Sequence, residues 1–163
     1  MDEIESVAAF MRQEKLTLVT AESCTAGLIA AMLADIPGAG QSLDCAFVVY
    51  SPNAKQRLLG VSAQTMAANN LTSEAVAIEM ALGAARNSPA NVAVSNTGVT
   101  DDTDDDIPAG TQCYAWVYTD NPDGRPRIYA ETVRFSGDRV EIRKQSARHA
   151  LLRIMHYHHR GQP

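Results

Sequence analysis

The spacing of hydrophobic residues changes along this chain from alternating helices and strands to two successive strands and a final helix. Apolar residues recurring at helical spacing predict helices over residues 4–15, 23–34, 52–59, 74–86 and 138–158. Short apolar runs rich in β-branched and aromatic residues predict strands over 16–21, 45–50, 91–95, 112–119 and 127–135. The polar segment 96–110 is predicted to be an exposed loop.

This order of elements predicts an α/β fold. Helices that alternate with strands indicate parallel pairing, whereas the turn residues at 120–124 predict a hairpin between the last two strands. We therefore expect a three-layer α/β/α sandwich with a mixed, mostly parallel sheet, formed by residues 1–163 as a single domain.

Local residues support the bounds of two of the predicted helices. Ser51 and Pro52 fit an N-cap followed by proline at the first helical position, and Gly60 fits the end of that helix. Thr72 or Ser73 fits the N-cap of the helix over 74–86.

Composition excludes several classes of protein. The net charge is −5, which argues against a protein that binds duplex nucleic acid. Three widely spaced cysteines give no disulfide framework and no zinc pattern. The first residues lack the features of a signal peptide, and no apolar run reaches the ~18–20 residues of a membrane helix. We expect a cytoplasmic protein without a nucleic-acid or membrane partner. Self-association is compatible with the sequence, but no residue fixes a stoichiometry.

The stretch Thr20–Gly27 (TAESCTAG) lies where a predicted strand passes into a predicted helix. Such a turn directs N–H groups and the positive end of the helix to one spot, which suits an anion or an oxyanion. On the local pattern Ser23 fits a plain N-cap better than a nucleophile, and both alternatives remain open. Cys24, at the same predicted helix start, is an alternative nucleophile.

The stretch Tyr50–Lys55 (YSPNAK) follows the next predicted strand. Because the carboxyl ends of parallel strands gather along one edge of a sheet, Ser23, Tyr50 and Lys55 are expected to converge. A lysine can act as a base when burial or a nearby cation lowers its pKa. The alternative for Lys55 is a solvated residue on a helix.

In this order the two stretches resemble the TAESCTGG and TYSNEAK motifs of the C-terminal domain of the CinA (competence/damage-inducible) family. Further matches follow along residues 16–152, to the family's LGV, VSE, TG, PVGT and GDR…R motifs: Leu59-Gly60-Val61, Ser73-Glu74, Thr97-Gly98, Pro108-Ala109-Gly110-Thr111, and Gly137-Asp138-Arg139 with Arg143. Each motif is weak alone, but their common order supports the resemblance.

The resemblance implies a nicotinamide-nucleotide amidase that hydrolyses the carboxamide of nicotinamide mononucleotide without a metal or an organic cofactor. It implies Ser23 as nucleophile, Lys55 as its base and Tyr50 as a group that orients or shields the site. The residues expected to bind the nucleotide substrate are Glu22, Cys24, Thr25, Thr97, Gly98, Arg139 and Arg143.

The chain departs from the family pattern at three places. Gly38-Ala39-Gly40 replaces Gly-Ser-Ser, Ala26 replaces a glycine, and residues 98–106 replace a glycine-rich loop with one that holds five aspartates. Because aspartates repel a phosphate, two alternatives remain beside the amidase. One is a weak or inactive paralogue that binds or senses a nucleotide, and the other is a hydrolase of a related amide.

Two clusters of residues contain side chains that can bind a metal ion. Asp102, Asp104 and Asp106 have the spacing of a calcium loop, but Ile107 and Cys113 stand where such a loop has glycine and glutamate. The four histidines lie at the end of the chain, in a segment expected to be frayed. We predict that neither cluster holds a metal.

Overall fold

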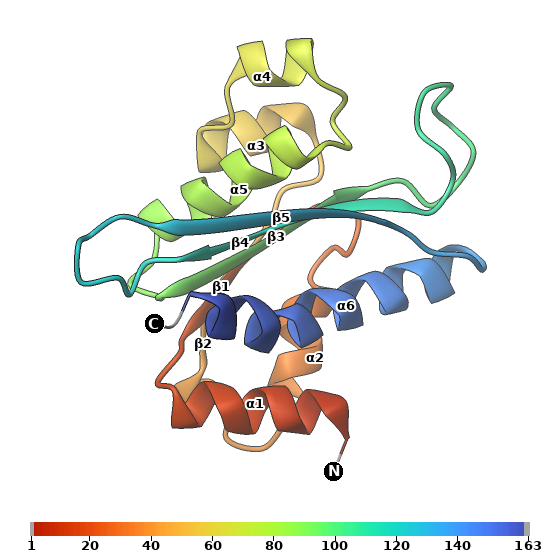
Figure 1. Cartoon of the computed structure of the whole chain (residues 1–163). Helices are drawn as coiled ribbons and strands as arrows, with labels where there is room; N and C mark the ends of the chain where they lie inside the picture. Colours follow the sequence, from red (N-terminus) through yellow and green to blue (C-terminus); the bar gives the residue numbers. More distant parts are fainter. Residues whose placement is uncertain (1, 162–163) are drawn as a thin grey trace.

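The computed structural model describes residues 2–161 and places a five-stranded sheet between two layers of helices (Figure 1). The strands are β1 (Leu18–Glu22), β2 (Leu43–Val48), β3 (Val92–Gly98), β4 (Thr111–Tyr118) and β5 (Arg127–Arg134). One layer holds α1 (Glu3–Gln13), α2 (Leu28–Ala34) and α6 (Arg139–Arg160). The other holds α3 (Pro52–Leu59), α4 (Ala63–Ala68) and α5 (Glu74–Arg86).

The sheet is mixed, with strand order β2-β1-β3-β4-β5. Strand β1 pairs in parallel with β2 and β3, whereas β4 pairs antiparallel with both β3 and β5. The predicted α/β class, the helices on both faces and the final hairpin are thus confirmed. Of the four strand pairings, two are parallel and two are antiparallel, because β4 runs in the opposite direction to the other four strands.

Three elements differ from the prediction. Helix α2 begins at Leu28 instead of residue 23, because Ala26 and Gly27 have φ of 48° and 99°, which no α-helix accommodates. Strand β3 continues to Gly98, so Asn96 and Thr97 are buried strand residues and not part of an exposed loop. The short helix α4 was not predicted, since four of its six residues are alanine or threonine. They give no stripe of large apolar residues, and none of the six is buried.

Strand β4 divides the hydrophobic core into its two layers. Its large aromatic residues, Tyr114, Trp116 and Tyr118, face α1, α2 and α6, whereas the small residues between them face α5. On the second face Gly83 of α5 lies so near α3 that an added Cβ would come within 2.0 Å of the Leu59 carbonyl oxygen. Small residues therefore let α3 and α5 pack closely over the sheet.

The aromatic residues of β4 also fix the position of α6. Tyr114 bonds the Ser146 hydroxyl at 2.8 Å, Trp116 donates to the Ala150 carbonyl at 2.9 Å, and Tyr118 donates to the Ile154 carbonyl at 2.6 Å. The three aromatic residues are two positions apart on β4, and the residues they bond are four positions apart on α6. These spacings place each set on one face of its element. This register brings the first turns of α6 to the carboxyl end of β1.

The predicted apolar stripe of α6 holds for Ala147, Leu151 and Ile154, which are buried, but not for Val140, which is 54% exposed near the helix start. The predicted fraying at its end is also wrong. The helix continues to Arg160, and His158 is buried with its ring beside Phe10 and Tyr118.

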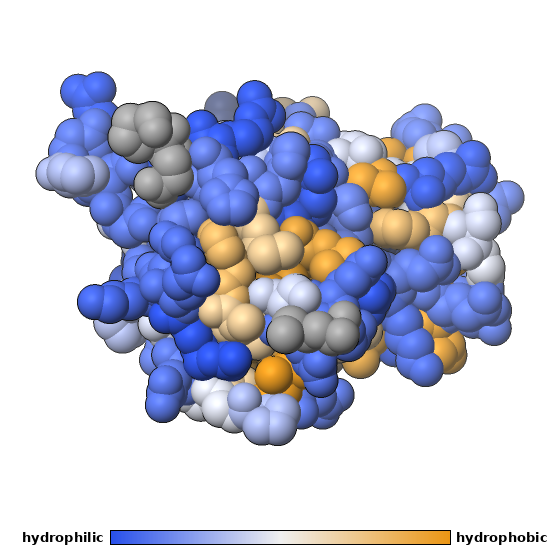
Figure 2. Space-filling model, turned by 60° about the horizontal axis from the view of Figure 1, so that its bottom comes forward, coloured by the Kyte–Doolittle hydropathy of each residue, from blue (hydrophilic) through white to orange (hydrophobic). Residues whose placement is uncertain are grey.

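Figure 2 views the molecule from the side of α1, α2 and α6; hydrophilic residues cover most of this face, and hydrophobic residues gather near its middle. Within residues 2–161 no helix has the length and apolar character needed to cross a membrane.

Candidate active site

Ser23 and Lys55 meet where β1 and β2 end. The Val49 N–H donates to the Glu22 carbonyl at 2.9 Å, which extends the β1–β2 pairing up to Ser23. Ser51 then caps α3 through a bond from the Ala54 N–H, with Pro52 in the first turn, as predicted. Because helix side chains lean toward the helix amino terminus, Lys55 in the first turns of α3 reaches back to the strand ends.

The Lys55 amine makes three hydrogen bonds in a buried position. Its Nζ lies 3.0 Å from Ser23 Oγ, 3.0 Å from the Val49 carbonyl oxygen and 2.9 Å from the Tyr50 carbonyl oxygen. The side chain is 1% exposed, and among the described residues no carboxylate forms an ion pair with it. Burial lowers the pKa of Lys55 to about 8.

This geometry suits the neutral amine as well as the ammonium ion. A neutral amine has two N–H donors and one lone pair. The two carbonyl oxygens of Val49 and Tyr50 can take both donors, which leaves the lone pair directed at Ser23. The serine hydroxyl then donates to the lysine, which is the arrangement a general base requires.

Glu22 does not reach the site, although it was predicted to bind substrate. Alternation along β1 directs Glu22 to the α2 face and Ser23 to the α3 face. The fully buried Glu22 carboxylate accepts five hydrogen bonds, from the Thr20 and Thr25 hydroxyls and from the N–H groups of Gly27, Ile29 and Ala30. The amino end of α2, expected to bind a substrate anion, is therefore occupied by the protein's own carboxylate.

Thr25 and Arg143 also hold the turn instead of lining the pocket. The Thr25 N–H donates to Asn96 Oδ1 at 3.0 Å. Arg143 donates from α6 to the carbonyls of Cys24 and Thr25, at 2.9 and 3.2 Å. The predicted anion clamp at Arg143 is thus a brace for the turn that bears Ser23.

Asn96 was not predicted as a site residue, although it holds the turn that bears Ser23. Its carbonyl accepts from the Ser23 N–H at 3.0 Å, and its side chain donates to Gln112 Oε1 and to Ser146 Oγ. This fully buried asparagine ties the Ser23 turn to β3, β4 and α6. The signal available in the sequence was its position directly before the Thr97-Gly98 motif.

A pocket of about 200 Å³ opens over Ser23 and Lys55. The predicted residues Cys24, Tyr50, Thr97 and Gly98 line it, together with Asn70, Leu71, Thr72, Val99 and Asp104, which were not predicted. The Thr97 hydroxyl donates to the Leu71 carbonyl at 2.9 Å. Burial raises the pKa of the Cys24 thiol, which disfavours the thiolate that the alternative nucleophile requires.

A second hollow of about 210 Å³ adjoins this pocket and shares Cys24, Tyr50, Gly98 and Val99 with it. Arg139 lines this outer part and donates to Asp101 Oδ2 at 2.8 Å and to the Thr100 hydroxyl. The Tyr50 hydroxyl and the Asp101 carboxylate raise the pKa of Arg139. Of the two predicted arginines, Arg139 is the one that faces the cleft.

Two of the three departures from the family pattern lie at opposite ends of the parallel strands. The loop after β3 supplies Val99, Thr100, Asp101, Thr103 and Asp104 to the cleft. Residues 38–40 instead precede β2, at the opposite end of the parallel strands, and line neither part of the cleft. The replacement at residues 38–40 therefore does not change the lining of the described cleft.

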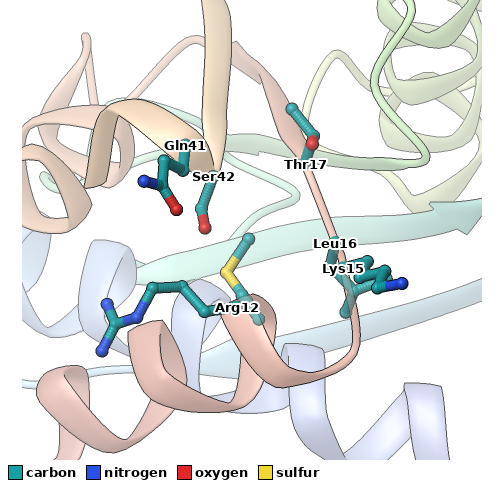
Figure 3. A pocket seen from close by; sticks show the side chains of 7 residues that line it. Arg12, Lys15, Leu16, Thr17, Gln41 and Ser42 are labelled. Carbon is teal, nitrogen blue, oxygen red and sulfur yellow. The ribbon is translucent and has the colours of Figure 1, made fainter. Parts of the chain in front are cut away.

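A separate pocket of about 210 Å³ lies at the amino end of β1 (Figure 3). It is lined by Met11, Arg12, Lys15, Leu16, Thr17, Gln41 and Ser42. In the part of the chain that the structure describes, no group of three or more histidine, cysteine, aspartate or glutamate side chains is arranged to hold a metal ion.

The sequence matches the CinA C-terminal domain family over residues 2–158. It is 36% identical over 149 residues to the nicotinamide-nucleotide amidohydrolase PncC of Escherichia coli K12, covering 90% of this chain and 87% of that protein. It is 37% identical over 158 residues to a putative competence-damage inducible protein of Symbiobacterium thermophilum, covering 94% of this chain but only 37% of that relative. The chain likewise spans 34% of a CinA-like protein of Chlorobium luteolum.

Solved structures with similar names superpose on this chain along most of its length. The competence damage-inducible protein A of Klebsiella pneumoniae superposes with a TM-score of 0.87 at 28% identity, over 99% of this chain and all of that one. A CinA superfamily protein of Escherichia coli superposes with a TM-score of 0.85 at 30% identity, over 95% and 88% of the two chains.

Proposed function

The chain belongs to the CinA C-terminal domain family, and on that premise we propose that it is an amidohydrolase that acts on the carboxamide of nicotinamide mononucleotide. Its products would be nicotinate mononucleotide and ammonia. The observation that supports this most directly is the 3.0 Å distance between Lys55 Nζ and Ser23 Oγ in a buried pocket. A relative that shares 36% of its residues bears the name of this activity.

The proposed reaction begins with neutral Lys55. Its amine takes the proton of the Ser23 hydroxyl while Oγ attacks the carboxamide carbon, which forms a tetrahedral intermediate. Lys55 then gives the proton to the departing nitrogen, so ammonia leaves and an acyl-enzyme ester remains. A water molecule, deprotonated by Lys55, then attacks the ester carbon. Lys55 returns that proton to Ser23 Oγ as the C–O bond breaks, and the carboxylic acid leaves and ionises in solution.

The oxyanion of the tetrahedral intermediate needs hydrogen-bond donors. The N–H groups of Ser23 and Thr25 are both engaged by Asn96, but among the described residues the Cys24 N–H donates to no protein acceptor. It belongs to the residue directly after the nucleophile, a common position for such a donor. We assign the Cys24 N–H to the oxyanion.

The rest of the nucleotide would extend into the outer part of the cleft. The carboxamide and its ring fit the inner pocket of about 200 Å³, and the sugar phosphate would approach Arg139, Thr100 and Thr103. Because Arg139 is paired with Asp101, a phosphate must displace that carboxylate to use the full charge of the guanidinium.

The test is ammonia release from nicotinamide mononucleotide by the wild type beside Ser23→Ala, Lys55→Ala and Cys24→Ala. We expect release by the wild type and by Cys24→Ala, and none above background from the other two. Activity that survives in Ser23→Ala but not in Cys24→Ala would instead assign the chemistry to the thiol.

The altered loop after β3 favours a second candidate, a paralogue that binds the nucleotide without hydrolysing it. Two of its aspartates, Asp101 and Asp104, line the cleft, and Asp101 already pairs with Arg139. Binding measured by calorimetry without any ammonia release would establish this candidate and reject the amidase.

A further inference from the structure

We infer that Asp104 selects substrates whose reacting carboxamide is joined to a cationic group, such as a pyridinium ring. The inference rests on the proposed function, because it concerns the pocket over Ser23. Asp104 lines that pocket together with Ser23 and Lys55, although it belongs to the loop after β3.

The Asp104 carboxylate is held in place by three donors. Asn70, which lines the same pocket, donates to Oδ2 at 2.8 Å. The N–H groups of Asp106 and Ile107 donate to Oδ1 at 2.8 and 3.2 Å. The Asn70 amide and these backbone donors lower the pKa of Asp104, so the group is ionised at neutral pH. One of its roughly four acceptor directions stays open to a ligand.

The protein supplies no cation for this carboxylate within residues 2–161, where no ion pair involves Asp104. Lys55 shares the pocket, but its amine is engaged by Ser23 and by the carbonyls of Val49 and Tyr50. Arg139, in the outer part of the cleft, is paired with Asp101. In the reactive form of the enzyme, in which Lys55 is the neutral amine, the charge left without a partner in the inner pocket is therefore negative.

A ligand with a positive charge meets this requirement. A pyridinium ring carries its charge within the ring that bears the carboxamide, so an amide placed at Ser23 brings the charge into the pocket with Asp104. A neutral ring gains nothing from the carboxylate, and an anionic group in the inner pocket is repelled.

The experiment compares two amides that differ in one N-methyl group and one charge, 1-methylnicotinamide and neutral nicotinamide. We measure the ratio of their kcat/KM values in the wild type, in Asp104→Asn and in Asp105→Asn. The last variant removes the same charge from an exposed residue of the same loop. We expect the wild type to favour the cationic amide and Asp104→Asn to reduce that preference about tenfold. Asp105→Asn should leave it within about twofold.

An unchanged ratio in Asp104→Asn, or an equal fall in Asp105→Asn, would overturn the inference while leaving the amidase in place. Calorimetric binding of both amides to Ser23→Ala, with and without Asp104→Asn, separates the two proposals. If the wild type releases no ammonia, the proposed function fails. A cation preference in binding that depends on Asp104 would then still support the inference, and its absence would reject it.

Discussion

The pockets at the two ends of β1 have nearly the same volume, about 200 Å³ over Ser23 and about 210 Å³ beside Leu16. Each contains a lysine. Lys55 is 1% exposed and directed at a hydroxyl, whereas Lys15 at the other end is exposed to solvent. Figure 3 shows the Lys15 side chain pointing away from Gln41 and Ser42. Size therefore does not distinguish the two pockets; what distinguishes them is the burial of a titratable group beside a nucleophile.

The difference follows from the direction of the parallel strands. At their carboxyl ends β1, β2 and β3 pass into the Ser23 turn, the start of α3 and the loop after β3, which bring polar residues together. At their amino ends the chain arrives from the carboxyl end of α1 and from the segment after α2. That segment supplies the buried Ser42, but among the described lining residues no buried base lies beside it.

The largest expected effect comes from the two lysines. Lys55→Met removes the proposed base and keeps the shape of the buried stem, so kcat/KM for amide hydrolysis should fall by roughly 10³-fold or more. Lys15→Met is the matched control in the other pocket and should leave kcat/KM within about twofold. Steady-state ammonia release from both variants checks this. A similar loss in both variants would mean that the two pockets do not differ as proposed.

Two glutamates, one near each end of β1, test whether the two ends also differ in their contribution to the free energy of unfolding. Glu22→Gln replaces a fully buried carboxylate that accepts five hydrogen bonds and places an amide N–H against backbone donors. We expect it to lower the free energy of unfolding by about 2–4 kcal/mol. Glu14→Gln, on an exposed residue at the end of α1, should change it by less than about 0.5 kcal/mol. Urea denaturation measures both, and equal effects would contradict the assigned role of Glu22.

The buried lysine also predicts a pH profile. Burial lowers the pKa of Lys55 from 10.5 to about 8, and the reactive form is the neutral amine. The wild-type kcat/KM should therefore rise about tenfold per pH unit below this value and level off above it. Profiles from pH 6 to 10 check this. A rate that is flat from pH 6 to 8 would show that proton removal by Lys55 does not limit the reaction.

Much of the site could be predicted from the sequence because its residues adjoin strand ends. Lys55, Tyr50 and Ser23 follow β-branched runs, and Ser51-Pro52 fixed the start of α3. The roles of Glu22 and Arg143 could not be predicted in this way. Alternation along β1 was enough to place Glu22 on the face away from Ser23, but the partners of its carboxylate depend on the turn over residues 23–27.

Asp104 illustrates what sequence patterns do not give. A run of aspartates indicates a solvated loop, and most of this loop is exposed. The hydrogen bond from Asn70, which lies 34 positions earlier in a segment without a strong pattern, is what fixes Asp104 at the pocket. Contacts of this kind depend on how α4 and its neighbouring turns pack on α5, and the helix itself was not predicted.

The smallest expected effect concerns backbone strain, which the two ends of β1 share. Lys15 and Ala26 have φ of 56° and 48°, a region that residues other than glycine rarely adopt. Lys15→Gly and Ala26→Gly should each raise the free energy of unfolding by about 0.5–1 kcal/mol, because glycine adopts this conformation without a Cβ conflict. Thermal and urea unfolding of both variants measure the gain. The hydrogen bonds from Arg143 to the Cys24 carbonyl and from the Thr25 N–H to Asn96 hold the turn beside Ala26 independently of that residue. The kcat/KM of Ala26→Gly should therefore stay within about twofold of the wild type. A loss of activity in Ala26→Gly alone would show that the strain at this end, unlike that at Lys15, helps to position Ser23.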